Sequence, residues 1–155
     1  MAEPVSILDA AIGSPHPALR PYVEQYVGYR MEGFAPGMHR GLPSHSLTLV
    51  VSLSDPVDMT RMPDPGQAPA AMTSLIGGLH SSAVNIRHDG SQYGMQLALT
   101  PLGSRALFGV PAGELASTVV DLGAVMGPEV ASLPDQLRDR PTWSSRARWA
   151  GAGGT

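Results

Sequence analysis

The chain has 155 residues, of which 43% are hydrophobic and 15% charged, with a formal net charge of -3 and no cysteine. This length supports one ordinary hydrophobic core, and the lack of cysteine excludes disulfides, zinc-thiolate sites and a cysteine nucleophile. The N-terminus lacks the basic and apolar regions of a signal peptide, and no stretch approaches the roughly 20 apolar residues that cross a bilayer. We therefore expect a globular, cytoplasmic domain without a membrane span.

Charge is distributed unevenly along the chain. All ten basic residues are arginine, and four of them lie near the C-terminal end, at Arg138, Arg140, Arg146 and Arg148. The part of the chain before them is acidic, so we expect no nucleic-acid surface on it. The four arginines of the tail could contact phosphate but could not read a sequence.

Alternation of apolar and polar residues predicts the first strands. Residues 19–31 predict a strand in their second half, and residues 45–53 give the strongest strand signal in the chain. Residues 1–18, which proline and glycine interrupt, predict a flexible lead-in. Residues 32–44 predict a turn-rich loop, and the proline-rich segment 54–72 predicts a mobile surface loop.

The next stretch predicts the rest of the sheet. Residues 84–88 alternate, Asp89-Gly90 offers the positive backbone φ of a tight turn, and residues 93–99 alternate on the return. We therefore expect a β-hairpin here. The pair Gly77-Gly78 lacks the following Lys-Ser/Thr of a phosphate loop, and predicts a bulge or a crowded backbone contact instead.

Helices follow the sheet in the sequence. Thr100 is a good N-cap with Pro101 at the first helical position, and Gly109 predicts the end of that helix. A second short helix is expected over residues 111–115. Residues 133–140 predict the start of another helix.

The stretch RHDGSQ, residues 87–92, raises the question of a Ser/His/Asp nucleophile. A triad needs a base within hydrogen-bond reach of the hydroxyl and an acid behind the base. Neighbouring strand residues point to opposite faces, so Arg87 and His88 diverge, and Asp89 is needed at the turn. Ser91 could reach His88 across the hairpin, but Asp89 could not then support the imidazole. We therefore expect a turn with polar lining, and no catalytic residue.

Four histidines suggest an alternative, a metal-dependent cupin-like enzyme that uses His39, His45, His80 and His88. The sequence contains no H-x-H pair, and the carboxylate next to His88, Asp89, is needed at the turn. Metal sites need three or four ligands with supporting groups around them. We therefore expect no metal and no other cofactor, and ordinary hydrogen-bonded or exposed histidines.

Several segments together resemble the N-terminal sensor domain of AraC/XylS-type transcription regulators. They are LRPYVEQYVGYR, GLPSHSLTLVVSLSDP, SLIGGLHSSAVNIRHDGSQYGMQLALTPLGSRALFGVPAGELASTVVDL and LPDQLRD. The resemblance extends from Leu19 to Arg138, and TPLGSRALFGVPAGEL is its most specific part. It implies an α+β fold, with an antiparallel cupin-like β-barrel or sandwich followed by C-terminal helices. The implied division is a lead-in at 1–18, a sensor domain at 19–133 and a truncated linker or helix start at 134–155.

The resemblance also implies a function. It indicates effector sensing, and dimerisation as a homodimer, in a bacterial transcription regulator, without catalysis and with DNA contacted only through a C-terminal helix-turn-helix domain that is absent here. A small-molecule effector would occupy the mouth or interior of the barrel. The candidate polar contacts, each on or beside a predicted strand, are Tyr29, His45, His80, Arg87 and Gln96. Alternation alone does not decide which strand face lines the cavity, and a plain protein-interaction module remains a further alternative.

Overall fold

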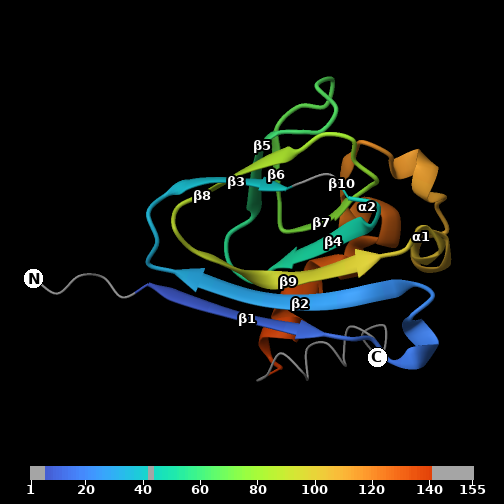
Figure 1. The fold of residues 1–155 in the computed structure, drawn as a ribbon, viewed down its shortest axis with the longest axis horizontal. Coiled ribbons are helices and arrows are strands. Elements are labelled where there is room, and N and C mark those ends of the chain that lie inside the picture. The colour runs from blue at the N-terminus through green and yellow to red at the C-terminus, as the bar shows by residue number, and fades with distance from the viewer. Residues whose placement is uncertain (1–5, 42–43, 141–155) are drawn as a thin grey trace, which may run out of the picture.

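Two antiparallel β-sheets lie face to face in the computed structural model, which describes residues 6–41 and 44–140 (Figure 1). The larger sheet has six strands in the order β1 (Ile7–Gly13), β2 (Val23–Glu32), β9 (Gln92–Leu99), β4 (Leu47–Ser52), β7 (Ser74–Gly77) and β10 (Val119–Asp121). The smaller sheet has four strands in the order β3 (Gly37–Gly41), β8 (Val84–His88), β5 (Val57–Arg61) and β6 (Ala70–Met72). The expected antiparallel sandwich is therefore confirmed.

Short helices complete the fold. They are η1 (Pro17–Leu19), α1 (Pro101–Phe108), η2 (Ala112–Leu115), α2 (Leu122–Met126), η3 (Pro128–Ser132) and α3 (Leu133–Arg138). The caps of α1 are as predicted, because Thr100 Oγ1 accepts a hydrogen bond from Gly103 N at 3.0 Å and Gly109 ends the helix at a φ of 68°. None of the helices in the described part of the chain is long and apolar enough to cross a membrane.

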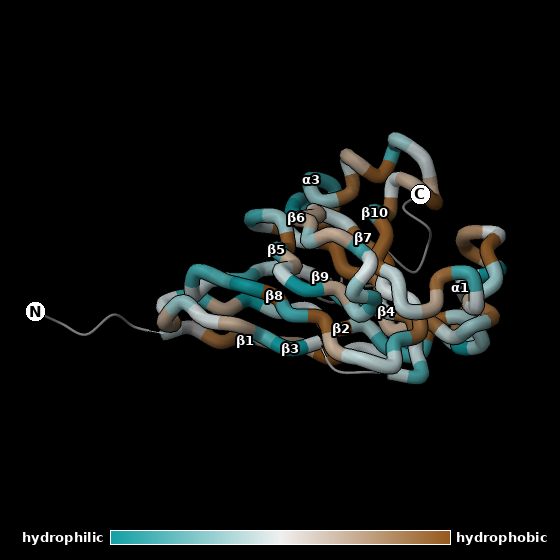
Figure 2. Tube along the Cα trace, turned by 90° about the horizontal axis from the view of Figure 1, so that it is seen from above, coloured by the Kyte–Doolittle hydropathy of each residue, from teal (hydrophilic) through white to brown (hydrophobic). Residues whose placement is uncertain are grey.

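The larger sheet uses both of its faces for packing. On one face Leu47, Leu49 and Leu99 join Leu122 of α2 and Leu137 of α3 in the main apolar cluster. This cluster fixes the helices on the sheet, because burying each of these large side chains contributes roughly 1.5–3 kcal/mol. Hydrophobic residues accordingly gather along β7 and β10 in Figure 2.

The other face of the larger sheet packs on the smaller sheet. Met59 of β5 and Val84 of β8 are buried against Leu75 of β7 and Val119 of β10. Alternation explains this arrangement, since residues two apart on a strand share a face. Val57 and Met59 of β5 pack in this second cluster, while Asp58 lies between them in sequence and pairs with Arg87 at the surface.

Three predicted loops contain strands, so those predictions are wrong. Residues 7–13 of the expected flexible lead-in form β1, which pairs with β2 along its whole length. The expected loop 32–44 contains β3, and the expected mobile loop 54–72 contains β5 and β6. In each case pairing with a strand distant in sequence supplies the hydrogen bonds that the local pattern did not suggest.

Side chains hold the remainder of segment 54–72 in place. Met62 is buried, and the Gln67 side chain both donates to Val119 O at 2.6 Å and accepts from Val119 N at 3.1 Å. Ser82 Oγ donates to Pro63 O at 2.7 Å. These buried contacts contradict the premise on which mobility of this segment was predicted.

The predicted hairpin at Asp89-Gly90 is also wrong. Gly90 does adopt a positive φ of 103°, but β8 and β9 do not pair with each other. Instead β8 pairs with β3 and β5, while β9 pairs with β2 and β4. The turn therefore carries the chain from one sheet to the other at one end of the sandwich.

Candidate functional site: a cavity at the end of the sandwich

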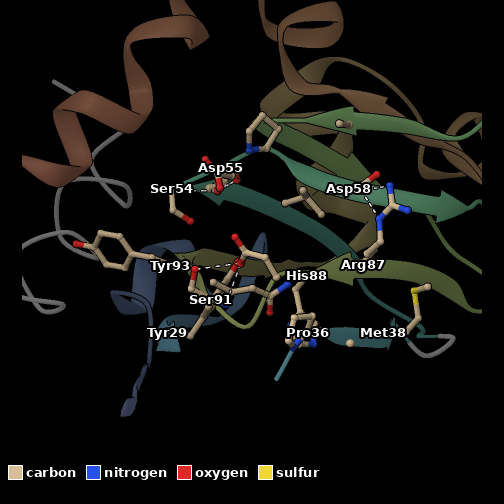
Figure 3. Close-up of a pocket in the computed structure, with 17 residues that line it drawn as sticks. Tyr29, Pro36, Met38, Ser54, Asp55, Asp58, Arg87, His88, Ser91 and Tyr93 are labelled. Atoms are coloured by element: carbon tan, nitrogen blue, oxygen red, sulfur yellow. Dashed lines mark hydrogen bonds and ion pairs between the residues drawn. The ribbon is translucent and has the colours of Figure 1, made fainter. Parts of the chain in front are cut away.

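A cavity of about 930 Å³ opens at the end of the sandwich where β8 turns into β9. Both sheets contribute to its walls, from β2, β4 and β9 on one side and from β3, β5, β6 and β8 on the other (Figure 3). Its polar lining residues are Tyr29, Ser52, Ser54, Asp55, Asp58, Arg87, His88, Asp89, Ser91, Gln92 and Tyr93. The volume lies within the range of about 300–1,000 Å³ that is usual for small-molecule sites.

Tyr29 lies on the face of the larger sheet that the smaller sheet covers. Its ring passes over Gly94 of β9, where a Cβ would approach Tyr29 Oη to 2.7 Å. Burial raises the pKa of Tyr29 to about 12, so the phenol remains protonated at physiological pH. Tyr29 Oη has no hydrogen-bond partner among the described residues, which leaves it available to a ligand.

His88 presents a second available group. Its Nδ1 accepts a hydrogen bond from Gly90 N at 3.1 Å, so a neutral imidazole carries its proton on Nε2. The ring lies beside Gly37 of the paired strand β3, where an added Cβ would be in ordinary contact at 3.4 Å from His88 Nε2. His88 Nε2 is therefore a hydrogen-bond donor at the cavity wall.

The charged groups of the cavity differ in how they are engaged. Arg87 Nε donates to Asp58 Oδ2 at 2.9 Å, which joins β8 to β5 at the rim. The Asp55 carboxylate has no hydrogen-bond or ion-pair partner among the described residues. Because Arg87 is the lining's sole cationic residue and is already paired, the cavity favours hydroxyl, amide or cationic groups over anions.

The Ser/His/Asp arrangement is not assembled. Ser91 donates from both its N and Oγ to Asp89 Oδ1, at 3.0 and 3.1 Å. These hydrogen bonds hold the pKa of Asp89 below its ordinary value. His88 Nδ1 is engaged by Gly90 N instead, so Asp89 supports the turn and does not orient the imidazole.

The five sequence candidates fall into two groups. Tyr29 and Arg87 line the cavity. Gln96 shares a sheet face with Tyr29 but lies two residues further along β9 than Gly94, and it is not a lining residue. His45 and His80 are at the opposite end of the sandwich, where His80 forms an isolated bridge with Ser44, and neither lines this cavity.

The cavity also contains residues that were not predicted as ligand contacts. Ser54, Asp55 and Asp58 belong to the segment assigned to a loop, and Gln92 begins β9. The sequence suggests a role for His88 only as a metal ligand or as a base. The signal that could have found them is the position of polar residues at strand ends, because such ends meet at the mouth of a sandwich.

The four histidines of the metalloenzyme alternative are not gathered. His39 is exposed on β3 and His45 is exposed before β4, while His88 alone lines the cavity. Within residues 6–41 and 44–140, no group of three or more His, Asp or Glu side chains is placed to hold a metal ion. The described part of the chain therefore offers no ligand set for that alternative.

His80 gives a prediction about pH. Its Nδ1 is buried without a hydrogen-bond partner among the described residues, and burial lowers the pKa of His80. The unfolded chain takes up this proton near pH 6.5 and the folded chain only at lower pH. Stability is therefore fully present above about pH 6.5 and is lost as pH falls through the window between the two pKa values.

The measurement is urea unfolding as a function of pH. His80 contributes to the slope of the free energy of unfolding against pH. We expect this contribution to stay below the one-proton limit of about 1.4 kcal/mol per pH unit, because the ring is only half-buried. His80→Gln should remove this contribution, whereas His39→Gln, at an exposed histidine, should retain it. An unchanged pH dependence in His80→Gln would contradict the assignment.

Comparisons with known proteins give one family. A family model described as "Domain of unknown function (DUF6597)" matches residues 13–121, a range that contains every residue lining the cavity. No curated protein matches the chain. A cupin domain from Bordetella pertussis is similar at 16% sequence identity and a TM-score of 0.36, over 64% of this chain and 98% of that one. A similarity this low supports no statement about the function of this chain. The fold is assigned from the strand pairing described above.

Proposed function

The chain belongs to the DUF6597 family, and we propose that its cavity binds a small-molecule effector. The observation that carries this proposal is the cavity of about 930 Å³ whose wall holds unengaged polar groups, Tyr29 Oη, His88 Nε2 and the Asp55 carboxylate. A few convergent polar groups in a concave site are what fix the orientation of a small ligand. Binding alone would suffice for this role, so we propose no catalysis.

We further propose that the chain is the effector-sensing part of a bacterial AraC/XylS-type regulator. The support is the sequence resemblance over residues 19–138, whose most specific segment forms α1 and η2 beside the sandwich. In this proposal DNA is contacted through a separate helix-turn-helix domain. Sequencing of the gene beyond the codon for Thr155 tests this, since an in-frame helix-turn-helix pair would support the regulator and an unrelated domain would contradict it.

A thermal-unfolding screen tests effector binding. The probes are a panel of sugars, amino-acid amides and small amines, chosen because the described lining has no unpaired arginine or lysine to receive an anion. A ligand at 100 times its Kd stabilises the folded state by about 2.7 kcal/mol, which raises Tm by roughly 5–10 °C for a chain of this size.

Matched tryptophan substitutions assign any such shift to the cavity. Ser54→Trp fills the cavity from an exposed lining position, and Ser81→Trp places the same side chain at an exposed position outside the lining. We expect the Tm shift to disappear in Ser54→Trp and to persist in Ser81→Trp. A shift of equal size in both variants would place the binding site elsewhere.

A further inference from the structure

The outer edge of the larger sheet is formed by β1, which pairs with β2 and with no other strand of the described residues. An unpaired strand edge presents N–H and C=O groups that can template pairing with another strand, and proteins usually protect such edges with short strands, prolines or basic residues. The other edge strands follow this practice: β10 and β6 have three residues each, and β3 carries Arg40. In contrast, β1 has seven residues and contains no proline, lysine or arginine.

Apolar side chains accompany this open edge. Leu8 and Ile12 are each 72% exposed, more than the other large apolar residues of the described chain. Both lie on the same face of the sheet, since Leu8 is opposite Met31 and Ile12 is opposite Val27 in the pairing of β1 with β2. Exposed apolar residues next to an unpaired edge indicate a surface that is covered in the assembled protein.

The two exposed apolar residues of β1, Leu8 and Ile12, lie at equal distances on either side of Ala10. In an antiparallel pair of identical strands centred on Ala10, Leu8 of one copy faces Ile12 of the partner subunit, and Asp9 faces Ala11 of the partner subunit. The apolar side chains then meet across the two-fold axis, and the two Asp9 carboxylates do not face each other. A two-fold interface requires this kind of self-complementarity, in which residue i meets j and j meets i.

We propose that β1 pairs antiparallel with β1 of a second copy of this chain, with the two-fold axis at Ala10, so that the two larger sheets form one continuous sheet. Cross-strand contact between Leu8 and Ile12 of the partner subunit removes the exposed apolar surface from water. The pairing does not depend on what the cavity binds.

The absence of cysteine from the chain makes a direct crosslinking test available. Directly opposed residues of antiparallel strands have Cα atoms about 4.5–5.5 Å apart, within the range of about 4.4–6.8 Å that a disulfide spans. Ala10→Cys should therefore form a disulfide-linked dimer on mild oxidation. Two copies of Leu8 would be four residues apart along the strands, about 13 Å, so Leu8→Cys should not crosslink.

Ala106→Cys is the matched control, because Ala106 is an exposed alanine on α1, away from the edge. Non-reducing gel electrophoresis after oxidation reports the three variants together. A dimer in Ala10→Cys alone supports the proposed register. Equal crosslinking in Leu8→Cys or Ala106→Cys, or none in Ala10→Cys, would overturn it.

Sedimentation equilibrium of the cysteine-free chain provides an independent measurement. We expect a monomer–dimer equilibrium that Ile12→Glu weakens by roughly tenfold or more, because two carboxylates would be buried at the interface. Leu102→Glu makes the same change at a leucine on α1 that is 54% exposed, and should leave the dimer unchanged. A wild-type monomer throughout the dilution series, or a dimer that Ile12→Glu does not weaken, contradicts the proposal.

Discussion

Gly78→Ala is expected to cause one of the largest losses of stability that any single methyl group can cause in this chain. A Cβ at Gly78 would lie 1.6 Å from Leu115 O and 2.4 Å from Leu115 C, which are backbone atoms of η2. Neither segment can move away easily, because Gly78 N donates to Thr118 O at 3.0 Å and Ser117 N donates to Leu79 O at 2.8 Å. We expect a loss of about 3 kcal/mol or more in the free energy of unfolding, and a fall in Tm of roughly 6–12 °C.

Gly113→Ala is the matched control for that substitution. Gly113 lies in η2, in the same segment as Leu115, and nothing lies within 4 Å of the position that its Cβ would occupy. We expect a change of about 0.5 kcal/mol or less, because the added methyl meets open space. Urea unfolding of both variants measures the difference, and equal stabilities for the two would show that the contact between Gly78 and Leu115 is not tight.

Local sequence was sufficient for the elements whose signals are local. The strands β2, β4 and β9 alternate over enough residues to be predicted, and the caps Thr100 and Gly109 identify α1. The glycine pair Gly77-Gly78 predicted a bulge or a crowded backbone contact, and the crowded contact is present at Gly78, where a Cβ would lie 1.6 Å from Leu115 O.

The smaller sheet was not predicted, apart from β8, because its strands depend on distant partners. Strand β5 has five residues between Pro56 and Pro63, and only Val57 and Met59 mark its inward face. Strand β3 begins and ends in glycine, and β6 has three residues. Each of these strands is stabilised by pairing with another part of the chain, which no local pattern reveals.

Pairing between strands distant in sequence also explains which residues of the cavity could be predicted from the sequence and which could not. Tyr29 and Arg87 were predicted because they lie on strands with clear alternation. The cavity joins them to Ser54 and Asp55 only because the smaller sheet folds over the larger one. His45 and His80 were grouped with them by residue type, and strand direction places those two histidines at the other end.

Gly90→Ala is expected to destabilise the turn between β8 and β9 that borders the cavity. Gly90 has a φ of 103°, and a Cβ there would lie 1.9 Å from Phe34 O. Phe34 N also donates to Gly90 O at 3.2 Å. This hydrogen bond holds the segment at Phe34 against the turn at Gly90, where the added methyl would need space. Gly109→Ala separates the cost of a positive φ from the cost of the steric clash, because Gly109 has a φ of 68° and nothing within 4 Å of its Cβ position.

We expect Gly109→Ala to lose about 1 kcal/mol, the cost of a positive φ alone. Gly90→Ala should lose about 3 kcal/mol, because the clash with Phe34 O is added to that cost. Hydrogen exchange should locate the damage, with faster exchange of the amides at Gly90 and Phe34, which the native turn holds in hydrogen bonds to His88 Nδ1 and Gly90 O. Equal losses in the two variants would mean that Phe34 can yield, and that the end of the sandwich around the cavity is less firmly closed than these contacts require.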